Sequence, residues 1–222
     1  MLEKNIREQI IELIHQQVVP AVGCTEPMAV ALCTARATEL LGQKPEHISV
    51  LLSANILKNA MGVGIPGTGM IGLPIAIALG ALVGKSEYQL EVIKDLTPVT
   101  LEAGKTFISE NRIDVKLKDG ITEKLYIEIT CEAEGHRATA IIMGTHTNIV
   151  FEEKDGTVLL DKMQPSVAAV EKTPLCLNLN TVWEFATTTP VDEIEFILEA
   201  KRYNLRAAAE ALKGNYGHCL GK

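Results

Sequence analysis

The pattern of apolar and polar residues divides the chain into a helical first part, a β-rich middle and a helical last part. Residues 3–18 carry isoleucine and leucine at intervals of three and four, which is the spacing of an amphipathic helix. A second helix is expected to begin near Thr25, with Thr25 as its cap, and to run to Gly42, because glycine commonly follows the last turn of a helix. The segment HISVLLSAN is typical of a strand.

Further along, MIGLPIAIALGALVG predicts a buried helix, and SEYQLEVIKDL and TPVTLEAGKTFISEN predict two more, the last capped by Thr97 with Pro98 in first position. RIDVKLK, KLYIEITCEAEG, RATAIIMGTHTNIVFEE and TVLLD alternate or are β-branched, and Asp-Gly and Glu-Gly turns separate them. TTTPVDEIEFILEAKRYNLRAAAEALKG then predicts a long amphipathic helix with a cap residue and with Pro190 as its first residue. We therefore expect an α+β fold with an antiparallel section near residues 112–160, and a candidate boundary near residue 110 between subdomains 1–110 and 111–222.

Composition and charge narrow the class of protein. The chain has 222 residues, of which 47% are hydrophobic and 22% charged, and its net charge is −7. This acidic balance, without clustered lysine and arginine, argues against nucleic-acid binding. The charged, amphipathic start does not resemble a secretory signal, and the cysteine count of 5 with wide spacing fits a reducing compartment, so we expect a cytoplasmic protein.

The glycine-rich segment GVGIPGTGMIGLP, residues 62–74, allows several interpretations. Its GxGxxG pattern would bind a dinucleotide only directly after a strand, but ILKNAM intervenes, and the lysine of a phosphate-binding loop is missing. The uncharged run 59–84 is long enough for a bilayer, yet its irregular start would leave peptide groups unpaired, so we expect no membrane insertion. A loop whose backbone N–H groups bind an anion, and a tight turn needed only for packing, both stay open.

Candidate chemical groups lie near this segment. Cys24 directly precedes a predicted helix, where the helix dipole favours a thiolate that binds metal or reacts. Asn55, Lys58 and Asn59 lie in SANILKNAMG, just before the glycines. His146 lies in GTHTNIV at a predicted strand edge, although a single histidine is more often structural. A soft ligand, amide donors, a lysine and a possible base beside glycine turns together indicate a site.

The segments PAVGCTEP, SANILKNAMGVGIPGTGMIGLPIAIALGAL and GTHTNIV, in this order and at these intervals, resemble the L-cysteine desulfidase family. That family is related to the alpha chains of iron–sulfur L-serine dehydratases, and the resemblance extends from about Val18 to the C-terminus. It implies a lyase with a [4Fe–4S] cluster and no pyridoxal phosphate. Members remove H₂S from L-cysteine, or water from L-serine, to give 2-aminoacrylate, which hydrolyses to pyruvate and ammonia.

The resemblance also suggests roles for individual residues. Cys24 would be a cluster ligand, as the matching motif implies. The remaining roles are assigned from residue chemistry. His146 and Lys58 are the catalytic candidates, because either can move a proton. The candidates for contacting the substrate are amide, hydroxyl and backbone donors: Thr25, Asn55, Asn59, Gly67, Thr68 and Gly69.

One departure from the family concerns length. Family chains continue beyond the point that matches Lys222 into a half that brings the remaining cluster cysteines, whereas Cys33, Cys131, Cys176 and Cys219 lie in no family cluster motif. We therefore expect this chain to lack the cluster and to be inactive alone, as an excised fragment, a truncated product or one subunit of a split enzyme.

The partners expected from this interpretation are L-cysteine or L-serine, between which the residues do not decide, and the C-terminal half in cis or in trans. A homo-oligomer is a further possibility, because the boundary with the other half would expose apolar surface. An amino-acid-binding or assembly module without catalysis is the alternative function.

Overall fold

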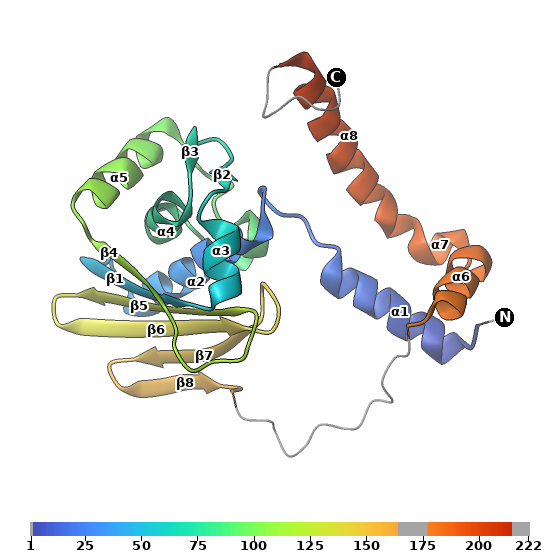
Figure 1. Cartoon of the computed structure of the whole chain (residues 1–222), viewed down its shortest axis with the longest axis horizontal. Helices are drawn as coiled ribbons and strands as arrows, with labels where there is room; N and C mark the ends of the chain where they lie inside the picture. Colours follow the sequence, from blue (N-terminus) through green and yellow to red (C-terminus); the bar gives the residue numbers. More distant parts are fainter. Residues whose placement is uncertain (1, 164–176, 215–222) are drawn as a thin grey trace. The chain divides into compact units, whose positions relative to one another are not determined.

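The computed structural model describes residues 2–163 and 177–214, and it has the α+β fold that the sequence predicts (Figure 1). The chain divides into two compact units, one of Ala21–Ala168 and one of Met1–Pro20 together with Ala169–Lys222. The candidate boundary near residue 110 falls inside the first of these units. All the candidate site residues also belong to that unit.

A mixed sheet with the strand order β4-β1-β5-β6-β7-β8 forms one layer of this unit (Figure 1). β1 pairs in parallel with β4 and antiparallel with β5, and the strands from β5 to β8 are all antiparallel. The expected antiparallel section is present from β5 to β8, but β4, which the sequence placed at its start, pairs in parallel with β1. The strands are β1 (His47–Leu52), β4 (Ile113–Leu117), β5 (Tyr126–Ala133), β6 (His136–Met143), β7 (Ile149–Lys154) and β8 (Thr157–Asp161).

Two of the predicted turns close hairpins in this sheet. Glu134 and Gly135 join β5 to β6 with φ angles of 52° and 80°, and Asp155 and Gly156 join β7 to β8 with φ angles of 49° and 80°. Positive φ at both central residues is typical of the type I′ turn, whose twist matches that of the flanking strands. The segment RATAIIMGTHTNIVFEE forms two strands rather than one, because a turn at residues 144–148 separates β6 from β7.

Helices cover one face of the sheet in successive layers (Figure 1). α2 (Thr25–Leu41) packs on β5 and β6, α4 (Leu73–Leu82) packs on α2, and α5 (Pro98–Ser109) packs on α4. The backbones of α2 and α4 come unusually close, since a Cβ added at Gly80 would lie 2.5 Å from the carbonyl oxygen of Ala31. The buried helix expected from MIGLPIAIALGALVG is thus central to the core.

Several helix predictions are confirmed and others need correction. α2 begins at Thr25 as expected, but Cys24 rather than Thr25 occupies the cap position. α5 has the predicted cap at Thr97 and Pro98 in its first turn. SEYQLEVIKDL contains only a short 3-10 helix, η1 (Ser86–Glu91), because Gln89 adopts a left-handed φ of 52°. α3 (Ala54–Ala60), which the sequence did not predict, begins where the Ser53 hydroxyl accepts a hydrogen bond from the Ile56 amide at 3.4 Å.

The other unit is helical in the part that the structure describes. The long helix predicted near its end is interrupted at residues 195–197, and Pro190 is the cap of α7 rather than its first residue. Arg7 binds Glu193 through two hydrogen bonds of 2.7 and 3.1 Å. None of the described helices of the chain is both long and apolar enough to cross a bilayer. The elements of this unit are α1 (Lys4–Gln17), α6 (Leu179–Thr188), α7 (Val191–Ile194), η2 (Glu195–Ile197) and α8 (Leu198–Lys213).

Candidate functional site

Cys24, Thr25 and Glu26 form a hydrogen-bonded group at the N-terminal end of α2. The Cys24 thiol donates a hydrogen bond to Oε2 of Glu26 at 2.9 Å, and the Thr25 hydroxyl donates to the same oxygen at 3.3 Å. All three residues are partly buried. Within the motif Gly-Cys-Thr-Glu-Pro, the side chains of Cys24 and Thr25 therefore both donate hydrogen bonds to the carboxylate of Glu26.

The same carboxylate joins this motif to α3. Oε1 of Glu26 accepts a hydrogen bond of 3.2 Å from the side-chain amide of Asn59. The hydrogen bond from Cys24 is the largest cause that holds the pKa of Glu26 below its ordinary value, and Asn59 and Thr25 act in the same direction against the effect of burial. Glu26 was not among the site residues expected from the sequence, although its position two residues after Cys24 in Gly-Cys-Thr-Glu-Pro was a usable signal.

The protonation of Cys24 differs from the sequence-based expectation. Burial raises the pKa of the Cys24 thiol, and the hydrogen bond to Glu26 raises it further. The helix dipole places only about half a positive charge at the N-terminus, so the full negative charge of Glu26 outweighs it. In this chain the expected thiolate is thus a thiol that donates to a carboxylate, and the role of Cys24 as a metal ligand stays a prediction.

The glycine-rich segment is a hairpin that lies against the loop preceding Cys24. β2 (Gly64–Ile65) pairs antiparallel with β3 (Met70–Ile71). Gly23 has a φ of +82°, and a Cβ added to it would lie 2.7 Å from Cγ of Pro66 in the turn between these strands. The two sequence motifs are therefore neighbours in space, and glycine at position 23 permits their contact.

Within the hairpin, Thr68 has a structural role. Its side chain is only 6% exposed, and its hydroxyl donates to the carbonyl of Ile65 at 2.6 Å and accepts from the amide of Met70 at 2.9 Å. Gly67, with a φ of +78°, and Gly69 are exposed on either side of it. The substrate contacts assigned to Gly67, Thr68 and Gly69 stay predictions, and the geometry leaves the two glycines as the accessible members.

α3 carries three further candidate residues, which belong to the segment SANILKNAMG. Asn55 and Asn59 are one turn apart, and Lys58 lies next to them, so the three side chains share one side of this short helix. Asn55 and Lys58 are exposed, whereas Asn59 is partly buried by its contact with Glu26. An ammonium group and an amide are thus available to solvent beside the Cys24–Glu26 group.

His146 lies in the turn between β6 and β7 and is partly buried. This turn follows Met143, which faces Tyr126 of β5 across the sheet. The carbonyl of Tyr126 in turn accepts a hydrogen bond of 3.0 Å from the amide of Ser53, immediately before α3. His146 therefore belongs to the end of the sheet at which α3 begins, and its catalytic role stays a prediction.

The described residues do not fit a four-iron cluster by themselves. Cys33 and Cys131 are fully buried between α2 and the sheet, where Cys33 donates to the carbonyl of Ala140 at 3.3 Å and burial raises the pKa of Cys131 to about 12. In residues 2–163 and 177–214 no group of at least three His, Cys, Asp or Glu side chains is placed to hold a metal ion. Cys176 and Cys219 lie outside the described residues. Cys24 is the one partly exposed thiol in the described part of the chain.

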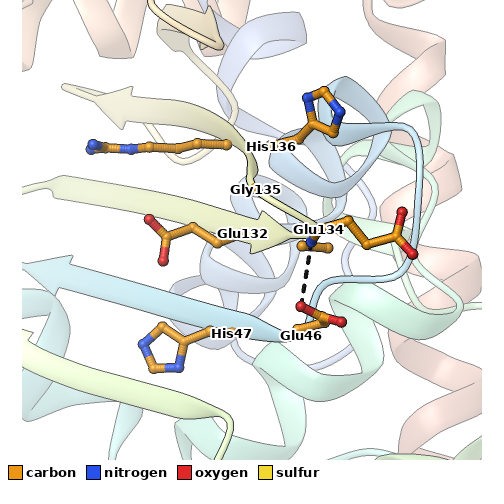
Figure 2. Close-up of a pocket in the computed structure, with 8 residues that line it drawn as sticks. Glu46, His47, Glu132, Glu134, Gly135 and His136 are labelled. Atoms are coloured by element: carbon orange, nitrogen blue, oxygen red, sulfur yellow. Dashed lines mark hydrogen bonds between the residues drawn. The ribbon is translucent and has the colours of Figure 1, made fainter.

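A surface depression of about 450 Å³ lies elsewhere, where β1 begins and β5 turns into β6 (Figure 2). Figure 2 shows the dashed hydrogen bond that the Glu134 amide donates to Glu46, at 3.3 Å. The His136 ring is 2.9 Å from Asp155 and is exposed. None of the candidate site residues lines this depression, whose lining is Glu46, His47, Glu132, Ala133, Glu134, Gly135, His136 and Arg137.

Comparison with known proteins places this α+β chain beside a group of bacterial proteins. It is 63% identical over 221 residues to a UPF0597 protein of Bacteroides fragilis and 62% identical over 222 residues to one of Bacteroides thetaiotaomicron. Both matches cover 100% of this chain and 52% of the relative. A UPF0597 protein of Aeromonas hydrophila is 43% identical over 215 residues, which are 96% of this chain and 48% of that relative.

The chain therefore spans about half the length of the curated relatives that it matches. No protein-family model matches it. No solved structure gives a significant match either.

Proposed function

We propose that this chain is one half of a lyase that eliminates H₂S from L-cysteine or water from L-serine. The product, 2-aminoacrylate, hydrolyses to pyruvate and ammonia. The proposal comes from the resemblance of three motifs to the L-cysteine desulfidase family. The observation that supports it most is the position of the Glu26 carboxylate, which accepts hydrogen bonds from both Cys24 and Asn59. In addition, Gly23 packs against Pro66. The start of α2, α3 and the glycine hairpin therefore lie next to one another, although they are separate segments of the sequence.

The chain's own residues suit the binding of an amino acid. Lys58 and Asn55 present an ammonium group and an amide to solvent, and both groups bind a carboxylate. The backbone of Gly67 and Gly69 is exposed, and the open space beside Gly69 lets a small substrate approach the hairpin. Lys58 and His146 are the candidates for removing the α-proton, the step that every β-elimination of this type requires.

A second half has to complete the site. The expected cofactor of the full-length family proteins is a [4Fe–4S] cluster, whose chemistry is to bind and polarise the leaving group. Cys24 is the ligand that this chain would contribute, and the described residues supply no others. The remaining ligands are therefore expected from the part of the relatives' length that this chain does not span.

The test is an anaerobic activity assay with both halves. The 222-residue chain is combined with the segment of the Bacteroides fragilis relative that it does not match, and iron and sulfide are supplied. We expect pyruvate from L-cysteine or L-serine with the mixture, and none with the chain alone. Cys24→Ser should reduce the rate at least 100-fold. Cys131→Ala, which changes a cysteine sealed in the core, should retain activity.

Two results would contradict the proposal. One is a stable complex of the two halves that forms no pyruvate from either amino acid. The other is an active complex in which Cys24→Ser has no effect. The chain alone is also expected to form no stoichiometric cluster under the same conditions, which absorbance of the thiolate-to-iron transitions would reveal.

The second candidate function is an assembly module without catalysis. The observation that favours it is the exposed apolar surface of the helical unit, for example Leu179 and Trp183 on α6. Calorimetry with L-serine and L-cysteine distinguishes the two, because an assembly module binds neither.

A further inference from the structure

A row of leucines runs along α8, and the described residues leave it exposed. Leu198, Leu205 and Leu212 follow one another at intervals of seven residues, which places them on one side of a helix with 3.6 residues per turn. Their exposed fractions are 56%, 58% and 65%, and every position of the helix from Lys201 to Lys213 is exposed. Ala208 and Ala209 fall on the same side. We call these five residues the leucine stripe.

Such a helix needs a partner. An isolated helix of 16 residues is marginally stable in water, because most helical stability in proteins comes from packing an apolar face. Apolar residues that recur every seven positions are the pattern by which one helix packs along another. The leucine stripe therefore has the pattern of a helix-packing surface, which a second helix would cover.

The charges beside the leucine stripe indicate what the partner carries. Around the helix, Lys201 lies within the leucine stripe, between Leu212 and Ala208, whereas Arg202 and then Lys213 lie just outside it beyond Ala209. Glu199 and Glu210 lie further round the helix and pair with Arg202 and Lys213, at 2.7 and 3.2 Å, so Lys201 is the cation that faces a partner most directly. A second copy aligned in parallel would bring like charges together, whereas a helix with acidic residues beside its apolar stripe would complement these cations.

The length of the relatives supplies a candidate for that helix. They match this chain from end to end at 62–63% identity, yet they are about twice as long. We propose that the leucine stripe of α8 binds the half of the relatives' length that this chain does not span, through an apolar helix with acidic flanks. The inference shares with the proposed function the need for that half, but it concerns binding and is measured without any catalytic readout.

The test measures association between two purified polypeptides. The 222-residue chain is titrated with the unmatched segment of the Bacteroides fragilis relative, and the complex is followed by calorimetry and light scattering. We expect a one-to-one complex. Leu205→Glu should weaken it at least tenfold, because a charge enters the apolar contact, and Lys201→Glu should weaken it most at low salt.

Ala207→Glu is the matched control, since it introduces the same side chain on the opposite side of α8, at an exposed position. It should change the affinity less than twofold, and circular dichroism checks that each variant keeps its helix content. Three outcomes would overturn the inference: no complex, a complex insensitive to Leu205→Glu, or a dimer or intramolecular contact of the chain alone that Leu205→Glu abolishes. A complex that forms as predicted but lacks lyase activity would overturn the proposed function only.

Discussion

At the scale of single residues, Glu26 organises the candidate site. Its two oxygens accept from Cys24, Thr25 and Asn59, so one carboxylate fixes side chains of two helices. A hydrogen bond between a thiol and a carboxylate stabilises the protonated thiol and the ionised carboxylate together. Burial is the largest cause that raises the pKa of Cys24, and this hydrogen bond raises it further, whereas the same hydrogen bond is the largest cause that lowers the pKa of Glu26.

This arrangement predicts how Cys24 reacts. The thiolate is the reactive form, so a raised pKa requires a higher pH for alkylation by iodoacetamide than an ordinary cysteine needs. Replacing Glu26 by Gln removes the negative charge and should lower the pKa of Cys24, so that alkylation at a fixed pH below that pKa becomes faster. Peptide mapping by mass spectrometry at several pH values measures the rate at each cysteine separately.

Two comparisons make this result interpretable. Glu102→Gln removes a carboxylate that pairs with Lys105 on α5, and it should leave the rate at Cys24 unchanged. Cys33 and Cys131 should stay unmodified in the folded protein, because both are buried. The account of Glu26 is wrong if Glu26→Gln slows alkylation of Cys24 or leaves it unchanged.

At the scale of elements, the sequence predicted the helices and hairpins that are specified by residues close together in the chain, such as cap and turn residues. α5 has its cap residue and proline in adjacent positions, and the β5–β6 and β7–β8 hairpins have their turn residues between alternating strands. The pairing of β4 with β1 joins segments that are far apart, and no local pattern specifies it. The left-handed Gln89 in η1 and the seven-residue α3 also lack a strong local signal, so tertiary packing decides their structure.

The contact between α2 and α4 predicts the effect of one substitution. Gly80→Ala places a methyl group 2.5 Å from the backbone oxygen of Ala31, and backbone on both sides leaves little room to adjust. We expect it to lower the free energy of unfolding by roughly 1–3 kcal/mol, which is typical of overpacking. Urea denaturation measures the change.

Gly62→Ala is the matched control for Gly80→Ala. Apart from Gly62 and its chain neighbours, no described atom lies within 4 Å of a Cβ added at Gly62, so this substitution should have a much smaller effect on the free energy of unfolding. Equal effects of the two substitutions would contradict the described packing of α4 on α2.

At the scale of the whole molecule, the larger unit brings the motif segments to one end of its sheet. The residue types of Cys24, Asn59 and the glycine segment made them candidates for the site from the sequence alone. It did not predict the bridge through Glu26 or the internal role of Thr68, since both depend on contacts between distant segments or within a folded turn. The fold class followed from periodicity, whereas the geometry of the site did not.

The contact between Gly23 and Pro66 gives the most direct test of the central claim that these motifs form one site. A double-mutant cycle compares Gly23→Ala, Pro66→Ala and the double variant by urea denaturation. The methyl group of Gly23→Ala meets Cγ of Pro66 at 2.7 Å, and Pro66→Ala removes that atom. We predict that the double variant is more stable than the sum of the single effects by about 1 kcal/mol. Additive effects, within about 0.3 kcal/mol, would show that the loop before Cys24 and the glycine hairpin do not touch.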